Sequence, residues 1–163
     1  MKRISFFVSI MLLYIGAFAQ HPVKIYDPLA DAKADVSGAL QMAKAEGKHV
    51  FLQIGGNWCP WCLRFNKFVL EDSQLDSLMK ANYKVVKVNF SKENENRALL
   101  ATLDYPQRFG FPVFVILDDN GKRIHTQDSG LLEDGAGYSR EKIATMLAQW
   151  SADAIHKSKE KFK

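Results

Sequence analysis

Five consecutive residues, Trp58-Cys59-Pro60-Trp61-Cys62, carry the two cysteines of this 163-residue chain. An apolar run and two glycines come before them and predict a buried strand that ends in a loop. The residues after them follow a helical pattern. Cys59 is therefore expected at the end of the loop and Cys62 one turn into the helix. Helix neighbours three residues apart have Cβ atoms about 5 to 6 Å apart, so the two sulfurs can close a disulfide.

The expected position of Cys59 favours a reactive thiolate. Pro60 suits the first position of a helix, because its missing N–H would have no partner within the helix. The free N–H groups and the positive end of the helix dipole favour negative charge at Cys59 and lower the pKa of its thiol. Cys59 is therefore the predicted nucleophile. Cys62, deeper in the helix, is the predicted resolving thiol, which attacks a mixed disulfide and releases the substrate.

The pair could instead be a structural disulfide, two inert thiols or part of a metal site. A bridge that closes so small a loop removes little entropy from the unfolded chain, so stability alone is a poor reason for it. Leu63 stands where a c-type haem motif needs histidine. Zinc would need two further ligands, and the histidines show no paired spacing. These are His21, His49, His125 and His156. We therefore expect redox exchange with no cofactor and no metal.

The first nineteen residues predict a removed signal peptide. Lys2 and Arg3 form a basic end, and residues 4–15 are mostly apolar. Residues 17–19 supply small side chains before an expected cleavage at Gln20. The apolar stretch is shorter than the roughly 20 residues that cross a bilayer. The mature protein is therefore expected outside the cytosol, periplasmic or secreted.

Composition predicts one ordinary folded domain, since 47% of the residues are hydrophobic and 25% are charged. These values exclude a disordered, collagen-like or coiled-coil chain. The net charge of +4 overstates the basic character of the mature protein, because the signal peptide holds Lys2 and Arg3. The sequence shows no basic stripe interleaved with aromatics, which argues against nucleic-acid binding. Residues 157–163 are interpreted as a solvated basic tail.

Hydrophobic periodicity and turn residues predict alternating helices and strands. Residues 128–138 contain three glycines and are interpreted as a flexible connector, with a partner-contacting loop as the alternative. The expected elements are a helix at 35–46, a strand at 49–54, a helix from Cys59 that restarts near Asp72 and runs to 80, a strand at 83–90, a helix at 95–103, antiparallel strands at 111–117 and 122–127, and a last helix capped by Ser139 with Ile143, Leu147, Trp150 and Ala154 on one stripe.

This order of elements and motifs resembles the thioredoxin family, especially its secreted bacterial members. The resemblance rests on strand, Trp-Cys-x-x-Cys and helix, followed by Gly110-Phe111-Pro112 before a hairpin and a last helix. It covers residues 35–150. It implies an α/β thioredoxin fold, a central mixed sheet flanked by helices. Residues 20–34 are then a lead-in and residues 35–156 the thioredoxin-like domain.

The resemblance also implies a substrate-binding surface. Trp58 matches the aromatic residue that precedes the family's cysteines. Pro112 matches the family's cis-proline, whose loop packs opposite the cysteines and offers backbone groups of Phe111 to a substrate peptide. Without the resemblance, Pro112 would be an ordinary trans proline at the start of a strand. Trp58 and Trp61 are candidate docking residues, and Trp61 could equally be a packing residue.

Gln53 departs from the usual thioredoxin pattern, and this departure changes the surroundings expected for Lys87. Gln53 stands six residues before Cys59, where many thioredoxins have a buried carboxylate, and an amide cannot titrate. Lys87 matches the lysine that often partners that carboxylate. We hypothesise that Lys87 lies beneath the cysteines and that its charge favours a thiolate. The alternative is a strand lysine with a solvated tip.

The resemblance implies a thiol-disulfide oxidoreductase that exchanges disulfides with protein substrates. Residues Pro60-Trp61 lack the histidine that stabilises the reduced thiolate in strongly oxidising relatives, which favours a reductant or isomerase. A reductant outside the cytosol needs an electron donor in the membrane, which favours the periplasm. We expect a monomer. The alternative is a non-catalytic thioredoxin-like module that binds unfolded chains or a partner protein.

Overall fold

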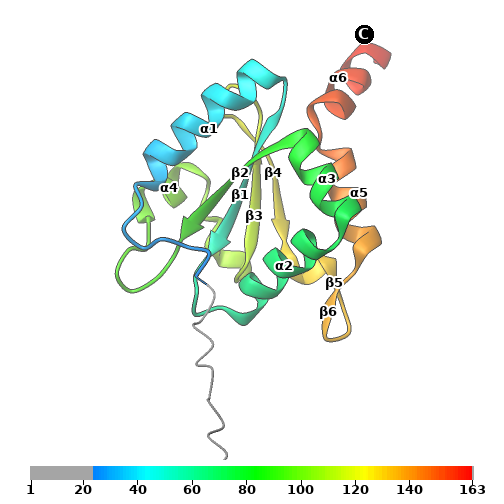
Figure 1. The fold of residues 1–163 in the computed structure, drawn as a ribbon. Helices are drawn as coiled ribbons and strands as arrows, with labels where there is room; N and C mark the ends of the chain where they lie inside the picture. Colours follow the sequence, from blue (N-terminus) through cyan, green and yellow to red (C-terminus); the bar gives the residue numbers. More distant parts are fainter. Residues whose placement is uncertain (1–23, 163) are drawn as a thin grey trace, which may run out of the picture.

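The computed structural model describes residues 24–162, so the predicted signal peptide lies outside the described residues. A four-stranded mixed sheet forms the centre, with the strand order β2-β1-β3-β4 (Figure 1). β1 (His49–Gly55) pairs parallel with β2 (Tyr83–Asn89) and antiparallel with β3 (Val113–Leu117). β4 (Arg123–Asp128) pairs antiparallel with β3 and forms the far edge, so the predicted hairpin is confirmed.

Helices cover both faces of this sheet. α1 (Ala32–Glu46) and α4 (Arg97–Thr102) lie on one face, and α2 (Pro60–Glu71), α3 (Ser73–Asn82) and α5 (Arg140–Gln149) lie on the other (Figure 1). Among the helices that the structure describes, none has both the length and the apolarity to cross a membrane. The predicted α/β architecture is confirmed.

The two central strands are buried on both faces, and their side chains contribute to two hydrophobic cores, one on each face of the sheet. β1 and β3 are buried along their whole length, as the continuous apolar runs predict. Alternate residues such as Val50 and Leu52 pack under α1 and α4. Between them, Phe51 points to the other face, where its ring lies 5.2 Å from that of Phe114. The second core also contains Phe65 of α2, so it fixes the helix that begins at the cysteines.

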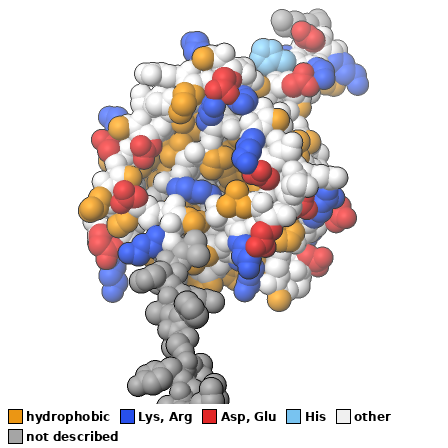
Figure 2. Space-filling view, viewed as in Figure 1, with side chains coloured by type: hydrophobic (Ala, Val, Ile, Leu, Met, Phe, Trp, Pro, Cys, Tyr) orange, Lys and Arg blue, Asp and Glu red, His pale blue; other side chains and the backbone are white. Residues whose placement is uncertain are grey.

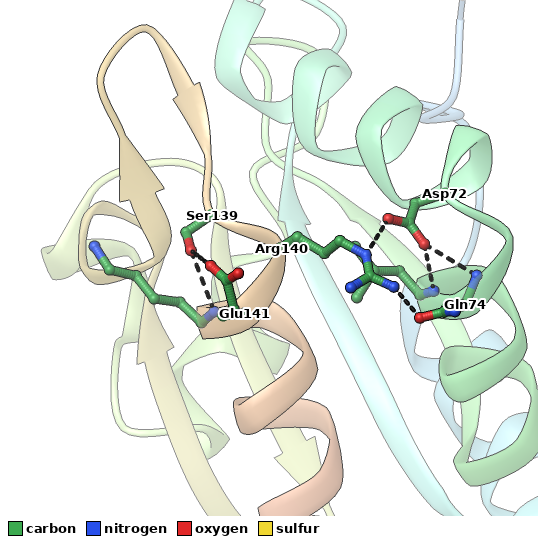
Figure 3. Close-up of polar contacts among 7 residues, drawn as sticks. Asp72, Gln74, Ser139, Arg140 and Glu141 are labelled. Atoms are coloured by element: carbon green, nitrogen blue, oxygen red, sulfur yellow. Dashed lines mark hydrogen bonds and ion pairs between the residues drawn. The ribbon is translucent and has the colours of Figure 1, made fainter.

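Asp72 ends α2 and begins α3, which confirms the predicted restart. Its carboxylate accepts hydrogen bonds from the N–H groups of Gln74 and Leu75, each at 3.0 Å. Figure 3 shows Arg140 reaching across from α5, and its Nε donates to Asp72 at 2.6 Å. The bond from the Leu75 N–H, followed by that from Arg140, holds the pKa of Asp72 below its usual value. Asp72 thus links α3 and α5 through its carboxylate and α2 through its backbone N–H, which donates to the Phe68 carbonyl.

The first and the last predicted helices differ most from the structure. α1 begins at Ala32 rather than at residue 35, because the Asp31 side chain accepts hydrogen bonds from the next free N–H groups and caps the helix earlier. The predicted single last helix is wrong. α5 ends at Gln149, and Ser151 caps a separate helix, α6 (Ala152–Lys161), by accepting a bond from the Ala154 N–H at 3.2 Å.

Residues 128–138 are more ordered than a flexible connector. They form a 3₁₀ turn at Ser129–Leu132 and a small hairpin of β5 (Glu133–Asp134) and β6 (Gly137–Tyr138). Leu132 and Tyr138 are buried in the second core. The segment therefore packs beside α2 and α5, and its glycines do not mark a loose loop.

The face of the molecule at the β2 edge carries mixed charge. Figure 2 shows Lys and Arg side chains interspersed with Asp and Glu, and hydrophobic side chains lie between them. A cavity of about 370 Å³ opens at this edge, lined by Leu70, Met79, Val85 and Lys87 among others. Lys87 therefore forms part of the wall of this cavity.

Candidate active site

Cys59 and Cys62 form a disulfide at the N-terminus of α2. Their Cα atoms are 5.3 Å apart, within the range that a disulfide needs. Cys59 is the N-cap residue in extended backbone, and Pro60 is the first residue of the helix, as predicted. Only 4% of Cys59 is exposed and none of Cys62. The predicted arrangement of the two sulfurs is therefore confirmed.

The helix N-terminus favours negative charge on Cys59. The Cys62 N–H donates a hydrogen bond to Cys59 Sγ at 3.1 Å, so the sulfur takes the place of a capping oxygen. In the dithiol form the same N–H and the helix dipole would stabilise a thiolate. The geometry thus supplies what a nucleophilic Cys59 requires.

The segment before β3 faces the cysteines. The Phe111-Pro112 peptide bond is cis, as the resemblance implied. Gly110 has φ +86°, a conformation that side chains disfavour, and it turns the chain out of a 3₁₀ helix (Pro106–Phe109) into this bond. The Phe111 side chain packs against the cluster formed by the two cysteines and Tyr26. Residues far apart in sequence therefore meet at the disulfide.

The two tryptophans have different surroundings. Trp58 is 56% exposed, its Nε1 donates to the Phe90 carbonyl at 2.7 Å, and its ring meets that of Phe111 edge to face at 5.5 Å. Trp61 is partly buried and packs edge to face on Tyr138 at 5.3 Å, with the Arg64 guanidinium 4.5 Å above its ring. Trp58 therefore offers an open aromatic face next to Cys59, and Trp61 packs against Tyr138 and against the cluster of Tyr26 and the two cysteines.

Gln53 connects the cysteines to Lys87. Its side chain is buried, and Nε2 donates to the Cys62 carbonyl at 3.1 Å while Oε1 accepts from Lys87 Nζ at 2.5 Å. Lys87 Nζ also donates to Asn66 Oδ1 at 2.7 Å. Burial lowers the pKa of Lys87 to about 8. The lysine tip therefore lies beneath the cysteine-bearing helix and not in solvent.

Two further site residues, Tyr26 and Asn57, were not found from the sequence. Tyr26 is 2% exposed and forms one buried cluster with the two cysteines, and its hydroxyl accepts a bond from Gln53 Nε2 at 2.8 Å. Asn57 holds Tyr26 by accepting its N–H at 3.1 Å and donating to its carbonyl at 2.7 Å. The partners are 31 residues apart, and neither belongs to a recognisable motif. No local pattern could have revealed this contact.

A comparison with protein families agrees with this geometry. Residues 31–119, more than half of the chain, match a family model described as thioredoxin-like. The chain belongs to the thioredoxin-like family. Within residues 24–162, this protein has no group of three or more His, Cys, Asp and Glu residues that could hold a metal ion.

Two characterised relatives match part of this thioredoxin-like chain. It is 27% identical over 95 residues to the disulfide bond reductase DsbH of Chlamydia pneumoniae, covering 53% of this chain and 55% of that protein. It is 30% identical over 80 residues to the thiol:disulfide interchange protein DsbD of Haemophilus ducreyi, covering 48% of this chain and 13% of that protein. The match thus spans about half the length of the first relative and a small part of the second.

A solved structure confirms the fold. The crystal structure of a disulphide isomerase from Xylella fastidiosa Temecula1 superposes with a TM-score of 0.69 at 28% sequence identity. The match covers 78% of this chain and 96% of that one. The expected thioredoxin fold with a central mixed sheet is therefore present.

Proposed function

We propose that the protein is a thiol-disulfide oxidoreductase that exchanges disulfides with protein substrates. The observation that carries the proposal is the Cys59–Cys62 disulfide at the N-terminus of α2, packed against Phe111 of the cis-proline segment. A reversible bridge at a helix N-terminus suits redox exchange better than it suits stabilisation, because its loop is so short. Pro112 and Pro60 belong to the same site as positioning residues.

The proposed reaction has two exchange steps. The Cys59 thiolate attacks a substrate disulfide, whose S–S bond breaks, and one substrate sulfur leaves as a thiolate while the other stays bonded to Cys59. The Cys62 thiolate then attacks Cys59 Sγ, forms the bridge seen in the structure and releases the second substrate sulfur. Two electrons pass from the cysteine pair to the substrate, and the leaving thiolates take protons from water.

We assign the direction to reduction or isomerisation. Pro60-Trp61 offers no histidine between the cysteines to stabilise a reduced thiolate strongly, so the pair is suited to give up electrons. The names of two similar proteins, a disulfide bond reductase and a disulphide isomerase, support the same direction. An electron donor in the membrane would then return the pair to the dithiol form.

The substrate would approach beside Trp58. The exposed tryptophan face and the backbone of Phe111 can hold an extended peptide by stacking and by a short β-like pairing. A hollow of about 540 Å³ continues from Trp58 and is lined by Pro28, Asn57 and Phe90 among others. We propose that this surface, with Pro112 behind it, brings a substrate disulfide to Cys59.

The predicted signal peptide at residues 1–19 supports a periplasmic or secreted location, in which a reductant works beside a membrane donor. We further propose that residues 35–156 form the catalytic domain, that residues 157–163 are a solvated tail, and that the mature protein acts as a monomer.

Replacement of each cysteine by serine tests the function. With dithiothreitol as the electron source, the wild-type protein should accelerate reduction of a protein disulfide, and Cys59→Ser should abolish the acceleration. Cys62→Ser should accumulate mixed disulfides that mass spectrometry can identify. If Cys59→Ser matches the wild-type rate, the oxidoreductase proposal fails and a binding module is the remaining interpretation.

A further inference from the structure

A buried tyrosine from outside the matched family region belongs to the same cluster as the disulfide. Tyr26 lies in the lead-in, before residues 31–119 that match the family model. Figure 1 shows this lead-in passing the carboxyl end of β1, where the loop to the cysteines begins. The Tyr26 side chain forms one buried cluster with Cys59 and Cys62. A polar group on the lead-in therefore reaches the reacting sulfurs.

The backbone of Tyr26 is held firmly against the cysteine loop. Asn57 Oδ1 accepts the N–H groups of Ile25 and Tyr26 at 2.9 and 3.1 Å, and Asn57 Nδ2 donates to the Tyr26 carbonyl at 2.7 Å. One side chain thus makes three bonds to two consecutive residues of the lead-in. Asn57 is adjacent to Trp58 and so ties the lead-in to the active-site loop itself.

The Tyr26 hydroxyl and the Cys62 sulfur share one small space in front of Gly55. A Cβ atom added to Gly55 would lie 3.0 Å from the Tyr26 hydroxyl oxygen and would overlap Cys62 Sγ. The hydroxyl oxygen and the sulfur therefore both lie beside the position that a Gly55 Cβ would occupy. The missing side chain of Gly55 leaves room for them. Both side chains are shielded from water, since Tyr26 is 2% exposed and Cys62 is fully buried.

The hydrogen-bond pattern leaves the hydroxyl proton of Tyr26 available. Gln53 Nε2 donates to the hydroxyl oxygen at 2.8 Å, so the tyrosine is the acceptor in that bond. Within residues 24–162 the hydroxyl donates no bond of its own in this bridged state. Burial raises the pKa of Tyr26 above its ordinary value, so the hydroxyl keeps its proton and can donate it in a second hydrogen bond.

We propose that the Tyr26 hydroxyl donates a hydrogen bond to the Cys62 thiolate and stabilises it for the resolving step. This inference rests on the proposed oxidoreductase function. Before that step the Cys62 proton goes to solvent, and the thiolate then attacks Cys59 Sγ, forming the bridge and breaking the bond to the substrate sulfur. Tyr26 keeps its proton throughout and transfers no electrons.

Other titratable groups around Cys62 do not duplicate this role. Cys59 is the partner sulfur, and Lys87 on β2 donates its hydrogen bonds to Gln53 and Asn66 and not to a cysteine of the described chain. Tyr138 on β6 donates its hydroxyl to the Trp61 carbonyl at 3.3 Å. Gln53 stands at the position where many thioredoxins have a carboxylate. Its amide cannot exchange a proton, but it orients the Tyr26 hydroxyl through a hydrogen bond.

Titration of a single thiol tests the proposal. In a Cys59→Ser background, the ultraviolet absorbance of the Cys62 thiolate gives its pKa after subtraction of the matching variant that also carries Cys62→Ser. Tyr26→Phe should raise this pKa by about 1 to 2 units, as expected when a charged group loses one hydrogen bond. In the enzyme with both cysteines, Tyr26→Phe should slow release of the mixed disulfide about tenfold at neutral pH.

Tyr83→Phe is the matched control, because Tyr83 is also buried and its hydroxyl donates to the Leu147 carbonyl at 2.7 Å, away from the cysteines. It should leave the Cys62 pKa unchanged. An unchanged pKa in Tyr26→Phe, or an equal shift in both variants, overturns the proposal. If Tyr26→Phe does not fold, Asn57→Ala decides, because it frees the lead-in and should also raise the pKa. The titration needs no turnover, so the result stands apart from the test of the oxidoreductase activity.

Discussion

Gly55→Ala should destabilise the protein although it adds a single methyl group. The new Cβ would overlap Cys62 Sγ and lie 3.0 Å from the Tyr26 hydroxyl, and neither neighbour can move into free space. Overpacking of this kind costs about 1 to 3 kcal/mol, and we expect about 2 to 3 kcal/mol because the sulfur is fixed by its bridge. At about 2 to 4 °C per kcal/mol, the melting temperature should fall by about 4 to 12 °C.

Gly38→Ala supplies the matched control for this prediction. Gly38 lies inside α1. Apart from its chain neighbours and its own helix backbone, no atom of the described residues lies within 4 Å of its added Cβ, so a Gly→Ala change here should stabilise the protein by about 0.5 to 1 kcal/mol. Urea unfolding of the oxidised proteins measures both effects. A Gly55→Ala protein as stable as the wild type would refute the close approach of Gly55 to Cys62.

Two further substitutions test the core and the buried lysine. Phe114→Ala removes a fully buried ring that lies 4.2 Å from the ring of Phe65, and it should cost about 3 to 5 kcal/mol in urea unfolding, whereas Phe109→Ala at a 41% exposed position should cost about 0.5 kcal/mol. The pKa of Lys87 falls from 10.5 to about 8 through burial, so between these pH values the unfolded chain holds a proton that the folded protein has lost. Stability of the wild type relative to Lys87→Met should therefore rise with pH from 8 to 10.5, and a difference that does not change with pH would contradict the burial of this amine.

The sequence predicted those parts of the fold that depend on neighbouring residues. The two continuous apolar runs became fully buried central strands, because both faces of β1 and β3 are covered by helices. Asp72 predicted a helix restart, since a capping side chain acts on N–H groups two and three residues away. The cysteine spacing predicted the disulfide because residues three apart at the start of a helix are neighbours in space.

Two kinds of feature were not predicted: a choice between competing helix caps, and packing between residues that are distant in sequence. The apolar stripe through Trp150 predicted one last helix. In the structure the Ser151 hydroxyl caps a new helix, so the stripe is divided between α5 and α6. Residues 128–138 contain glycines typical of a loop, yet Leu132 and Tyr138 bury themselves in the core.

The sequence predicted those residues of the candidate site that belong to a recognisable motif. Cys59, Pro60 and Cys62 form a local pattern whose geometry follows from the helix, and Pro112 was placed by resemblance to a family. Tyr26 lies in a segment without periodicity, and its contacts to Asn57 and Gln53 become visible only when the chain folds. The location of Lys87 beneath the helix was one of two interpretations, and its hydrogen bonds to Gln53 and Asn66 decide between them.

The shielding of Cys59 has a consequence for how the proposed cycle proceeds. Only 4% of this residue is accessible, and every incoming sulfur must react at this one shielded atom. In the proposed cycle, a protein to be reduced and a protein that delivers electrons must then bind in turn, since neither can reach Cys59 while the other covers it. The two visitors should compete in steady-state kinetics, and a surplus of either should slow the cycle.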